Sequence, residues 1–168
     1  MKRGRQLMEN EDNPPVQKNL LAEAVRELSL RNFVPTGRVW RDKIGDFAVG
    51  MMDDSGFPCA VVAKGSAVWT NPGSKELEVS FQVQLVEGWE APVIMALKES
   101  PSASWLFYIA DPVQIRLRPH WKNKRYVPMV NFAFAQMMEY NEHEGLQEIW
   151  EKLKTKRKET IGFYGSGM

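Results

Sequence analysis

An amphipathic segment follows a polar N-terminus. Between residues 16 and 32, apolar residues recur three and four positions apart, which is the spacing that places side chains on one face of an α-helix. Pro15 suits the first turn, where its missing N–H costs no hydrogen bond, and Asn32 is a typical stop. The pattern therefore predicts a helix whose buried face carries Leu20, Leu21, Ala24, Val25 and Leu28.

The middle of the chain has the shorter periodicity of β-strands. Residues 77–85 alternate apolar and polar side chains without a break, which predicts a strand with one buried and one solvated face. Two apolar runs, 92–97 and 105–110, are too short for typical helices and are bounded by breakers, so they predict interior strands. A turn is predicted at residues 53–56, which read Asp-Asp-Ser-Gly. Shorter apolar runs predict two earlier strands at 44–51 and 59–63, and the run at 33–40, interrupted by Pro35 and Gly37, is a third candidate.

A second amphipathic segment near the C-terminus predicts a final helix, with Leu146, Ile149, Trp150 and Leu153 on its apolar face. Strands and helices do not alternate regularly, which argues against a doubly wound parallel sheet. The order of elements instead predicts a mixed α/β (α+β) fold, in which an N-terminal and a C-terminal helix flank a central mixed sheet. We expect a flexible arm at 1–14, a single globular domain at 15–158 and a C-terminal tail at 159–168.

Composition narrows the class of protein without naming a function. The 168 residues carry 22 Lys and Arg against 21 Asp and Glu, and this net charge of +1 excludes a uniformly basic nucleic-acid coat. No stretch reaches the roughly 18 apolar residues that a membrane-spanning helix needs. The N-terminus lacks the apolar core of a secretory signal, and a single cysteine excludes intrachain disulfides. These features predict a cytoplasmic protein with no membrane partner.

Several familiar catalytic motifs are missing from the sequence. Neither GxGxxG nor GxxxxGK, the glycine-rich loops that hold phosphates, is present. His120 and His143 are the two histidines, and with one cysteine they cannot supply a His-rich or Cys-rich metal site. Cys59 lies in an apolar run, which is typical of a buried core residue.

Two charged residues stand where neighbouring strands could bring them together. Asp46 lies in the second predicted strand, and Lys64 ends the third. If these strands are adjacent and antiparallel, both residues lie at one end of the sheet. A carboxylate there can bind Mg²⁺, and a lysine can orient a water molecule or stabilise a phosphoryl transition state. Glu23, on the first helix, is a further carboxylate for the same place.

This order of features resembles the PD-(D/E)xK nuclease superfamily, which has the restriction-endonuclease-like fold. Its members read as a helix with Glu, a strand, a Gly-Asp strand, a turn, and a strand ending in (Glu/Asp/Gln)-x-Lys. The match covers about residues 16–70. The resemblance implies Mg²⁺-dependent hydrolysis of phosphodiesters, with Asp46 as the metal ligand, Lys64 as the catalytic lysine and Glu23 as the helix glutamate. Val62 departs from the pattern, because it occupies the position of the second acidic ligand.

The missing ligand leaves the activity open. In an active enzyme another carboxylate, such as Glu76 or Glu78, would have to replace the one that Val62 lacks. Without it the chain keeps the scaffold and loses the chemistry, since a fold does not fix a function. Two functions therefore remain: a nuclease-like domain in nucleic-acid metabolism or defence, or a non-catalytic module that binds nucleic acid or protein on a similar or unrelated α+β scaffold.

Residues 116–126 form a basic segment. They include five positive charges, no acidic residue and interleaved aromatic side chains, a pattern typical of phosphate contacts and base stacking. The candidate nucleic-acid-binding residues are Arg116, Arg118, Trp121, Lys122, Lys124 and Arg125. The alternative is a solvated hairpin, because Arg116, Leu117 and Arg118 alternate as they would in a strand.

Two further features bear on partners. The basic cluster at 152–158 is explained by the dipole of the last helix and by the glutamates that precede it. The strand predicted at 77–85 would favour a homo-oligomer if it lies at a sheet edge. The partners expected from the sequence are thus nucleic acid and a second copy of the chain.

Overall fold

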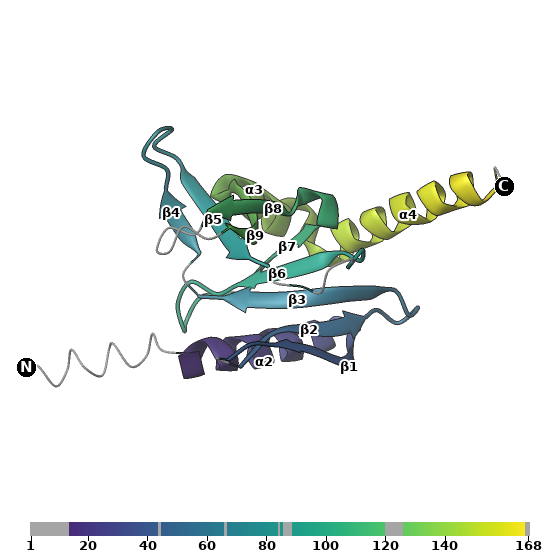
Figure 1. Cartoon of the computed structure of the whole chain (residues 1–168), viewed down its shortest axis with the longest axis horizontal. Helices are drawn as coiled ribbons and strands as arrows, with labels where there is room; N and C mark the ends of the chain where they lie inside the picture. Colours follow the sequence, from purple (N-terminus) through teal and green to yellow (C-terminus); the bar gives the residue numbers. More distant parts are fainter. Residues whose placement is uncertain are drawn as a thin grey trace, which may run out of the picture.

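Two β-sheets and three α-helices make up residues 14–43, 45–65, 67–83, 85, 89–119 and 126–166, the part of the chain that a computed structural model describes (Figure 1). The five-stranded sheet is mixed, because β3 and β6 run parallel while the other neighbours are antiparallel. Its order is β1 (Val34–Arg41), β2 (Asp46–Met52), β3 (Pro58–Lys64), β6 (Val93–Leu97) and β7 (Leu106–Ala110). The four-stranded antiparallel sheet has the order β4 (Val68–Thr70), β5 (Leu77–Gln82), β9 (Tyr126–Ala133) and β8 (Arg116–Pro119).

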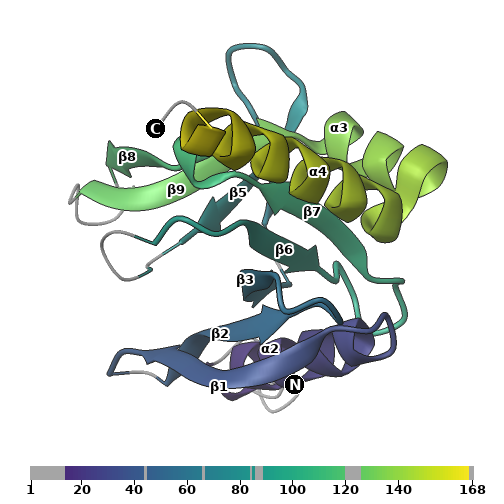
Figure 2. The same ribbon diagram turned by 90° about the vertical axis from the view of Figure 1, so that its right-hand side faces the viewer.

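The two longest helices cover one face of the five-stranded sheet, and the four-stranded sheet covers the other. In Figure 2, α4 crosses β7 and α2 lies beside β1 and β2. None of the described helices is long and apolar enough to cross a membrane. The helical segments are α2 (Pro14–Ser29), the short η1 (Pro112–Gln114), α3 (Phe134–Glu139), the π-helical η2 (Tyr140–Glu144) and α4 (Gly145–Ser166).

The core between the two sheets explains the uninterrupted apolar runs. Residues of β3 and β6 are buried on both faces, because helices cover one side and the second sheet covers the other. Tyr108 of β7 stacks on Phe132 of β9 with ring centroids 3.9 Å apart, and Gln136 of α3 donates to the tyrosine oxygen at 2.8 Å. These contacts fix the second sheet on the first.

The predicted fold class is confirmed. The helices expected at the two ends and the strands expected at 33–40, 44–51, 59–63, 92–97 and 105–110 are all present within a few residues. The strand expected at 77–85 is β5, but β4 and β9 flank it on both sides, so the prediction that it offers a free edge for oligomerisation is wrong. The expected arm at 1–14 lies outside the described residues up to position 13.

The tail predicted at 159–168 is helical as far as Ser166, where the description ends. The residues after Trp150 are mostly Lys, Glu, Arg and Thr, and the first glycine is Gly162. Lys, Glu and Arg are good helix formers, and one glycine costs only about 1 kcal/mol, so nothing ends α4 earlier. Figure 1 shows the end of α4 extending beyond the sheets.

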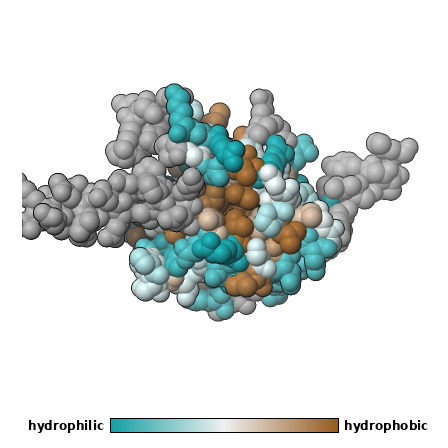
Figure 3. All heavy atoms as spheres, turned by 90° about the horizontal axis from the view of Figure 1, so that it is seen from below, coloured by the Kyte–Doolittle hydropathy of each residue, from teal (hydrophilic) through white to brown (hydrophobic). Residues whose placement is uncertain are grey.

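Apolar side chains also reach the surface. Seen from below, the molecule carries a band of hydrophobic side chains between hydrophilic ones (Figure 3). Leu30 and Val34, on either side of the turn from α2 into β1, are 80% and 45% exposed.

At the β7 edge of the five-stranded sheet, Asn141 of η2 accepts from the N–H of Phe107 and donates to its carbonyl, both at 3.0 Å. This side chain occupies the backbone groups of β7 that another strand would need.

Candidate nucleic-acid interface

The predicted catalytic pair lies at one end of the five-stranded sheet. Asp46 begins β2 and Lys64 ends β3, and the two strands are antiparallel neighbours, as expected. Asp46 accepts from Arg41 of β1, with Nε and Oδ1 2.6 Å apart. Burial lowers the pKa of Lys64, and among the described residues no carboxylate forms an ion pair with it. The two side chains are therefore neighbours in the sheet without being partners.

A bulge in β2 determines where Asp46 points. Trp40 pairs with Ala48, but the next residue, Arg41, pairs with Asp46, so Phe47 is an extra residue in the ladder. Opposite residues of an antiparallel ladder share a face, and successive residues of a strand alternate between faces. Because Trp40 and Ala48 belong to the core between the sheets, Arg41 and Asp46 lie on the helix-covered face.

Lys64 belongs to the other face. It continues the alternation of Ala60 and Val62, which pack in the core between the two sheets. Val62 itself is 3% exposed, so the position of the expected acidic ligand is part of that core. The structure thus brings Asp46 and Lys64 to one end of the sheet but not to one face of it.

Glu23 has a different lysine as its partner. Its carboxylate is 2.7 Å from Nζ of Lys98, which follows β6. Glu78, a substitute considered for the missing ligand, lies on β5 and accepts from Asn71 at 2.7 Å. No three His, Cys, Asp or Glu side chains of the described part of the chain gather as metal ligands. Asp46, Glu23 and Glu78 thus each interact with a different side chain and do not converge on one position.

The four-stranded sheet has an open face that sequence reasoning only partly anticipated. Its inner face carries Val79, Phe81, Val130 and Phe132, which are buried against the first sheet. The strand register places every second residue on the other side, which we call the outer face. The outer face consists of Trp69, Glu78, Ser80, Gln82, Arg116, Arg118, Val127, Met129, Asn131 and Ala133.

Two of the predicted nucleic-acid-binding residues lie on this outer face. Arg116 and Arg118 alternate along β8, opposite Met129 and Val127, and both are exposed. The guanidinium of Arg116 donates to the carbonyl oxygens of the residues before it, which leaves its charge without a carboxylate in the described structure. The other four candidates, Trp121, Lys122, Lys124 and Arg125, lie outside the described residues.

An exposed tryptophan shares the outer face. Trp69 of β4 is 39% exposed, and its indole N–H donates to Ser80 Oγ at 2.7 Å. Between Trp69 and the arginines, the side-chain oxygen of Asn131 is buried and has no hydrogen-bond partner among the described residues. No sequence pattern indicated β4, because three residues are too few to show a period. The alternation of β5 was the available signal for the outer face. A strand with one polar face indicates a sheet with one solvated face, to which its neighbouring strands also contribute polar side chains.

Comparison with family models, with curated proteins and with solved structures gives no match. The site therefore has to be judged from its own residues.

A buried ion pair is the largest feature that the sequence did not reveal. Asp53 and Lys154 are 4% and 8% exposed, and their charged atoms are 2.7 Å apart. The carboxylate also accepts from the indole of Trp150 at 2.9 Å, and from Ser55 and the N–H of Phe57. Burial by itself would raise the pKa of Asp53, but these hydrogen bonds outweigh it and hold the pKa well below its usual range. The cluster connects α4 to the turn between β2 and β3.

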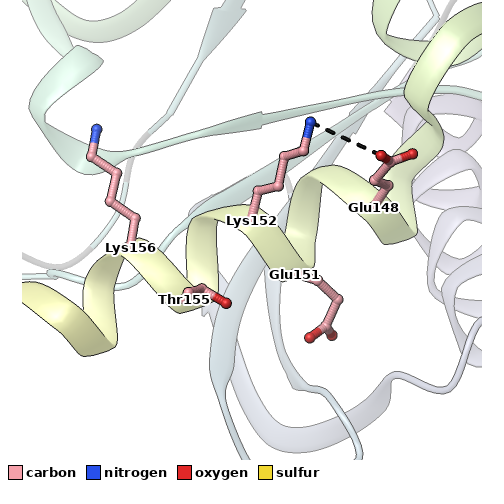
Figure 4. Close-up of a pocket in the computed structure, with 5 residues that line it drawn as sticks. All are labelled: Glu148, Glu151, Lys152, Thr155 and Lys156. Atoms are coloured by element: carbon pink, nitrogen blue, oxygen red, sulfur yellow. Dashed lines mark ion pairs between the residues drawn. The ribbon is translucent and has the colours of Figure 1, made fainter.

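Part of the C-terminal basic cluster is thus structural rather than a solvated helix end. Lys154 is buried, and Arg157 pairs with Asp111 at 3.1 Å. The pocket on the surface of α4, shown in Figure 4, is lined by side chains of that helix alone, and Glu148 lies 4.0 Å from Lys152 within it. Its exposed, mutually compensating charges favour neither phosphate nor carboxylate ligands.

Cys59 has the environment of a core residue, as predicted. Its side chain is fully buried among residues of the helix-covered core. Burial, with a smaller contribution from the charge of Asp53, raises the pKa of the thiol to about 12. A thiol with such a pKa is not a nucleophile at neutral pH.

Proposed function

We propose that this chain is a non-catalytic nucleic-acid-binding domain, and that the outer face of its four-stranded sheet is the binding surface. The observation that supports this most directly is the placement of Arg116 and Arg118, two exposed guanidinium groups on one open face. Glu78 is the one carboxylate among the outer-face residues, and Asn71 already donates to it. The face is therefore net positive, as contact with a phosphate backbone requires.

Salt dependence tests this proposal. A protein that neutralises phosphates releases counterions, so its affinity falls as the salt concentration rises, with a slope of about −0.9 per phosphate contact on duplex DNA. We expect wild-type protein to bind fluorescently labelled DNA, measured by anisotropy, and to lose affinity steeply between roughly 50 and 200 mM salt. Arg116→Gln with Arg118→Gln should weaken binding and reduce the magnitude of that slope by about 2.

The matched control is Arg26→Gln. Arg26 is an exposed arginine of α2, on the helix-covered side of the molecule. The substitution removes one positive charge and leaves the outer face unchanged, so the slope of affinity against salt concentration should stay as in wild type. Binding that is absent for single-stranded and duplex DNA and for RNA, or equal losses in the control, would exclude the proposal.

A nuclease on a restriction-endonuclease-like scaffold is the second candidate. It is supported by the element order over residues 14–64, which runs helix, strand, Gly-Asp strand, turn and a strand ending in Lys64. It also has Asp46 and Lys64 at one end of the sheet, although on different faces. The test is incubation with plasmid and with single-stranded DNA in Mg²⁺ or Mn²⁺. Cleavage by wild type that Asp46→Ala abolishes supports it, and no cleavage, or equal cleavage by the variant, removes it.

A further inference from the structure

The outer face has two different kinds of side chain at opposite corners. Trp69 lies on β4 and the two arginines on β8, which are the outermost strands of the sheet. The register places Trp69 opposite Glu78, and Arg116 in the row of Gln82 and Met129, four residues further along β5. With strands about 4.8 Å apart and residues rising about 3.3 Å, the two corners are roughly 20 Å apart.

The ring of Trp69 is fixed in a position in which it can stack on a base. Its indole N–H already has a partner in Ser80 Oγ, so the ring is anchored on the sheet while 39% of the residue is exposed. An aromatic ring in such a position can stack on an unpaired base of any type, because every base has a π-face. The bases of a duplex stack on one another and do not offer that face.

The middle of the outer face is polar and uncharged. The side-chain oxygen of Asn131 is buried there and has no hydrogen-bond partner among the described residues. Gln82 and Met129 fill the rest of the row toward the arginines. Such groups can contact base edges while the guanidinium groups hold the backbone.

We infer that the ligand of the outer face is a single-stranded nucleic acid, which crosses the sheet from the phosphate-binding Arg116 and Arg118 to a base stacked on Trp69. This inference rests on the proposed function and names its ligand class. The roughly 20 Å between the corners is a distance that a short single strand can span.

A duplex is the competing ligand. Two antiparallel strands can enter a major groove as a ribbon, and β8 and β9 also expose Leu117 and Tyr126, 67% and 69% respectively, on the opposite side from the arginines. That mode would use β8 and β9 and leave Trp69 out of contact. The single strand is favoured because it uses both corners of the outer face.

The experiment compares a labelled 12-nucleotide single strand with a duplex of the same sequence. Trp69→Ala should weaken binding of the single strand roughly 5- to 100-fold, the range for one lost base stack, and leave duplex binding unchanged. Trp69→Phe, which keeps an aromatic ring, should recover most of the loss. Circular dichroism and urea unfolding of both variants are the control for folding. Because the side chain of Trp69 is partly exposed, we expect both variants to retain the fold.

The outcomes separate the two proposals. Equal binding of the single strand by wild type and Trp69→Ala, or tighter binding of duplex by wild type, overturns the inference. If Arg116→Gln with Arg118→Gln still weakens binding in that case, the proposed function stands. If wild type binds neither the single strand nor the duplex, the inference and the proposed function are both wrong.

Discussion

Replacing Lys154 with methionine tests the ion pair that holds α4 on the sheet. Methionine keeps most of the length and apolar volume of the lysine side chain, so the change removes chiefly the charge. It leaves Asp53, which is 4% exposed, as a buried carboxylate without a cation at 2.7 Å. Removing one partner of a buried pair typically costs about 3–5 kcal/mol in unfolding free energy.

The structure favours the lower end of that range. After the substitution Asp53 still accepts from Trp150, from the N–H and hydroxyl of Ser55 and from the N–H of Phe57, all between 2.8 and 2.9 Å. Those donors continue to stabilise the charge, so we expect a loss of about 3 kcal/mol. For a chain of this size the loss corresponds to a fall in Tm of roughly 6–12 °C.

Urea unfolding followed by tryptophan fluorescence measures the loss, with Lys152→Met as the matched control. Lys152 lies half a turn away on α4, its side chain is 64% exposed, and its carboxylate partner is 4.0 Å distant. The control should cost no more than about 0.5 kcal/mol. The reasoning is wrong if Lys154→Met and Lys152→Met have the same midpoint.

The same pair gives stability a defined pH dependence. Because the folded-state pKa of Asp53 is lowered, its contribution is complete above its unfolded pKa of about 3.8 and is lost as the pH falls toward the folded value. The hydrogen bond that Lys154 donates to Asp53 raises the pKa of Lys154, so that contribution is complete at neutral pH and is lost at alkaline pH. Asp53→Asn should remove the part of the pH dependence of stability that this carboxylate causes at acid pH. The double variant Asp53→Asn with Lys154→Met should lose less unfolding free energy than Lys154→Met alone.

Three further predictions follow from single side chains. Cys59, with a pKa of about 12, should react with a disulfide reagent at pH 8 only as fast as the protein unfolds; immediate reaction of the folded protein would contradict its burial. Asn141→Ala should lower the unfolding free energy by roughly 1–3 kcal/mol and promote aggregation, seen by light scattering, because it frees the edge of β7. Lys64→Met should stabilise the protein at pH 7. Burial lowers the pKa of Lys64 in the folded protein. The unfolding free energy of wild type should therefore rise with pH between this lowered pKa and the unfolded value of 10.5, and the rise should be absent in the variant.

The periodicity of the sequence was sufficient for the layers of the fold. Strands buried on both faces, such as β3 and β6, read as apolar runs, and the half-buried, polar outer face of β5 reads as alternation. Periodicity could not say that the strands divide between two sheets. That division depends on which strands pair, and β4 is too short to show a pattern.

Long-range ion pairs were equally invisible. The residues Asp53 and Ser55 predict a turn, and they do form one. The same carboxylate, however, also holds Trp150 and Lys154, about 100 positions later. The sequence predicts a helix that ends soon after Lys154, where the helix dipole would explain a positive charge, so no local rule distinguishes the buried Lys154 from its exposed neighbours.

The predicted catalytic pair fails to meet because of a single extra residue. In an unbroken ladder, side chains directly opposite one another share a face, which is the assumption behind pairing Asp46 with Lys64. Phe47 shifts the register of β2 against β1 by one, and a one-residue shift turns a side chain to the other face. Asp46 then meets Arg41 on the helix side, while Lys64 stays with Val62 in the core between the sheets. Asp46 and Lys64 therefore lie on different faces of the sheet, and the two exposed arginines of the outer face remain the observation that supports the proposed nucleic-acid binding.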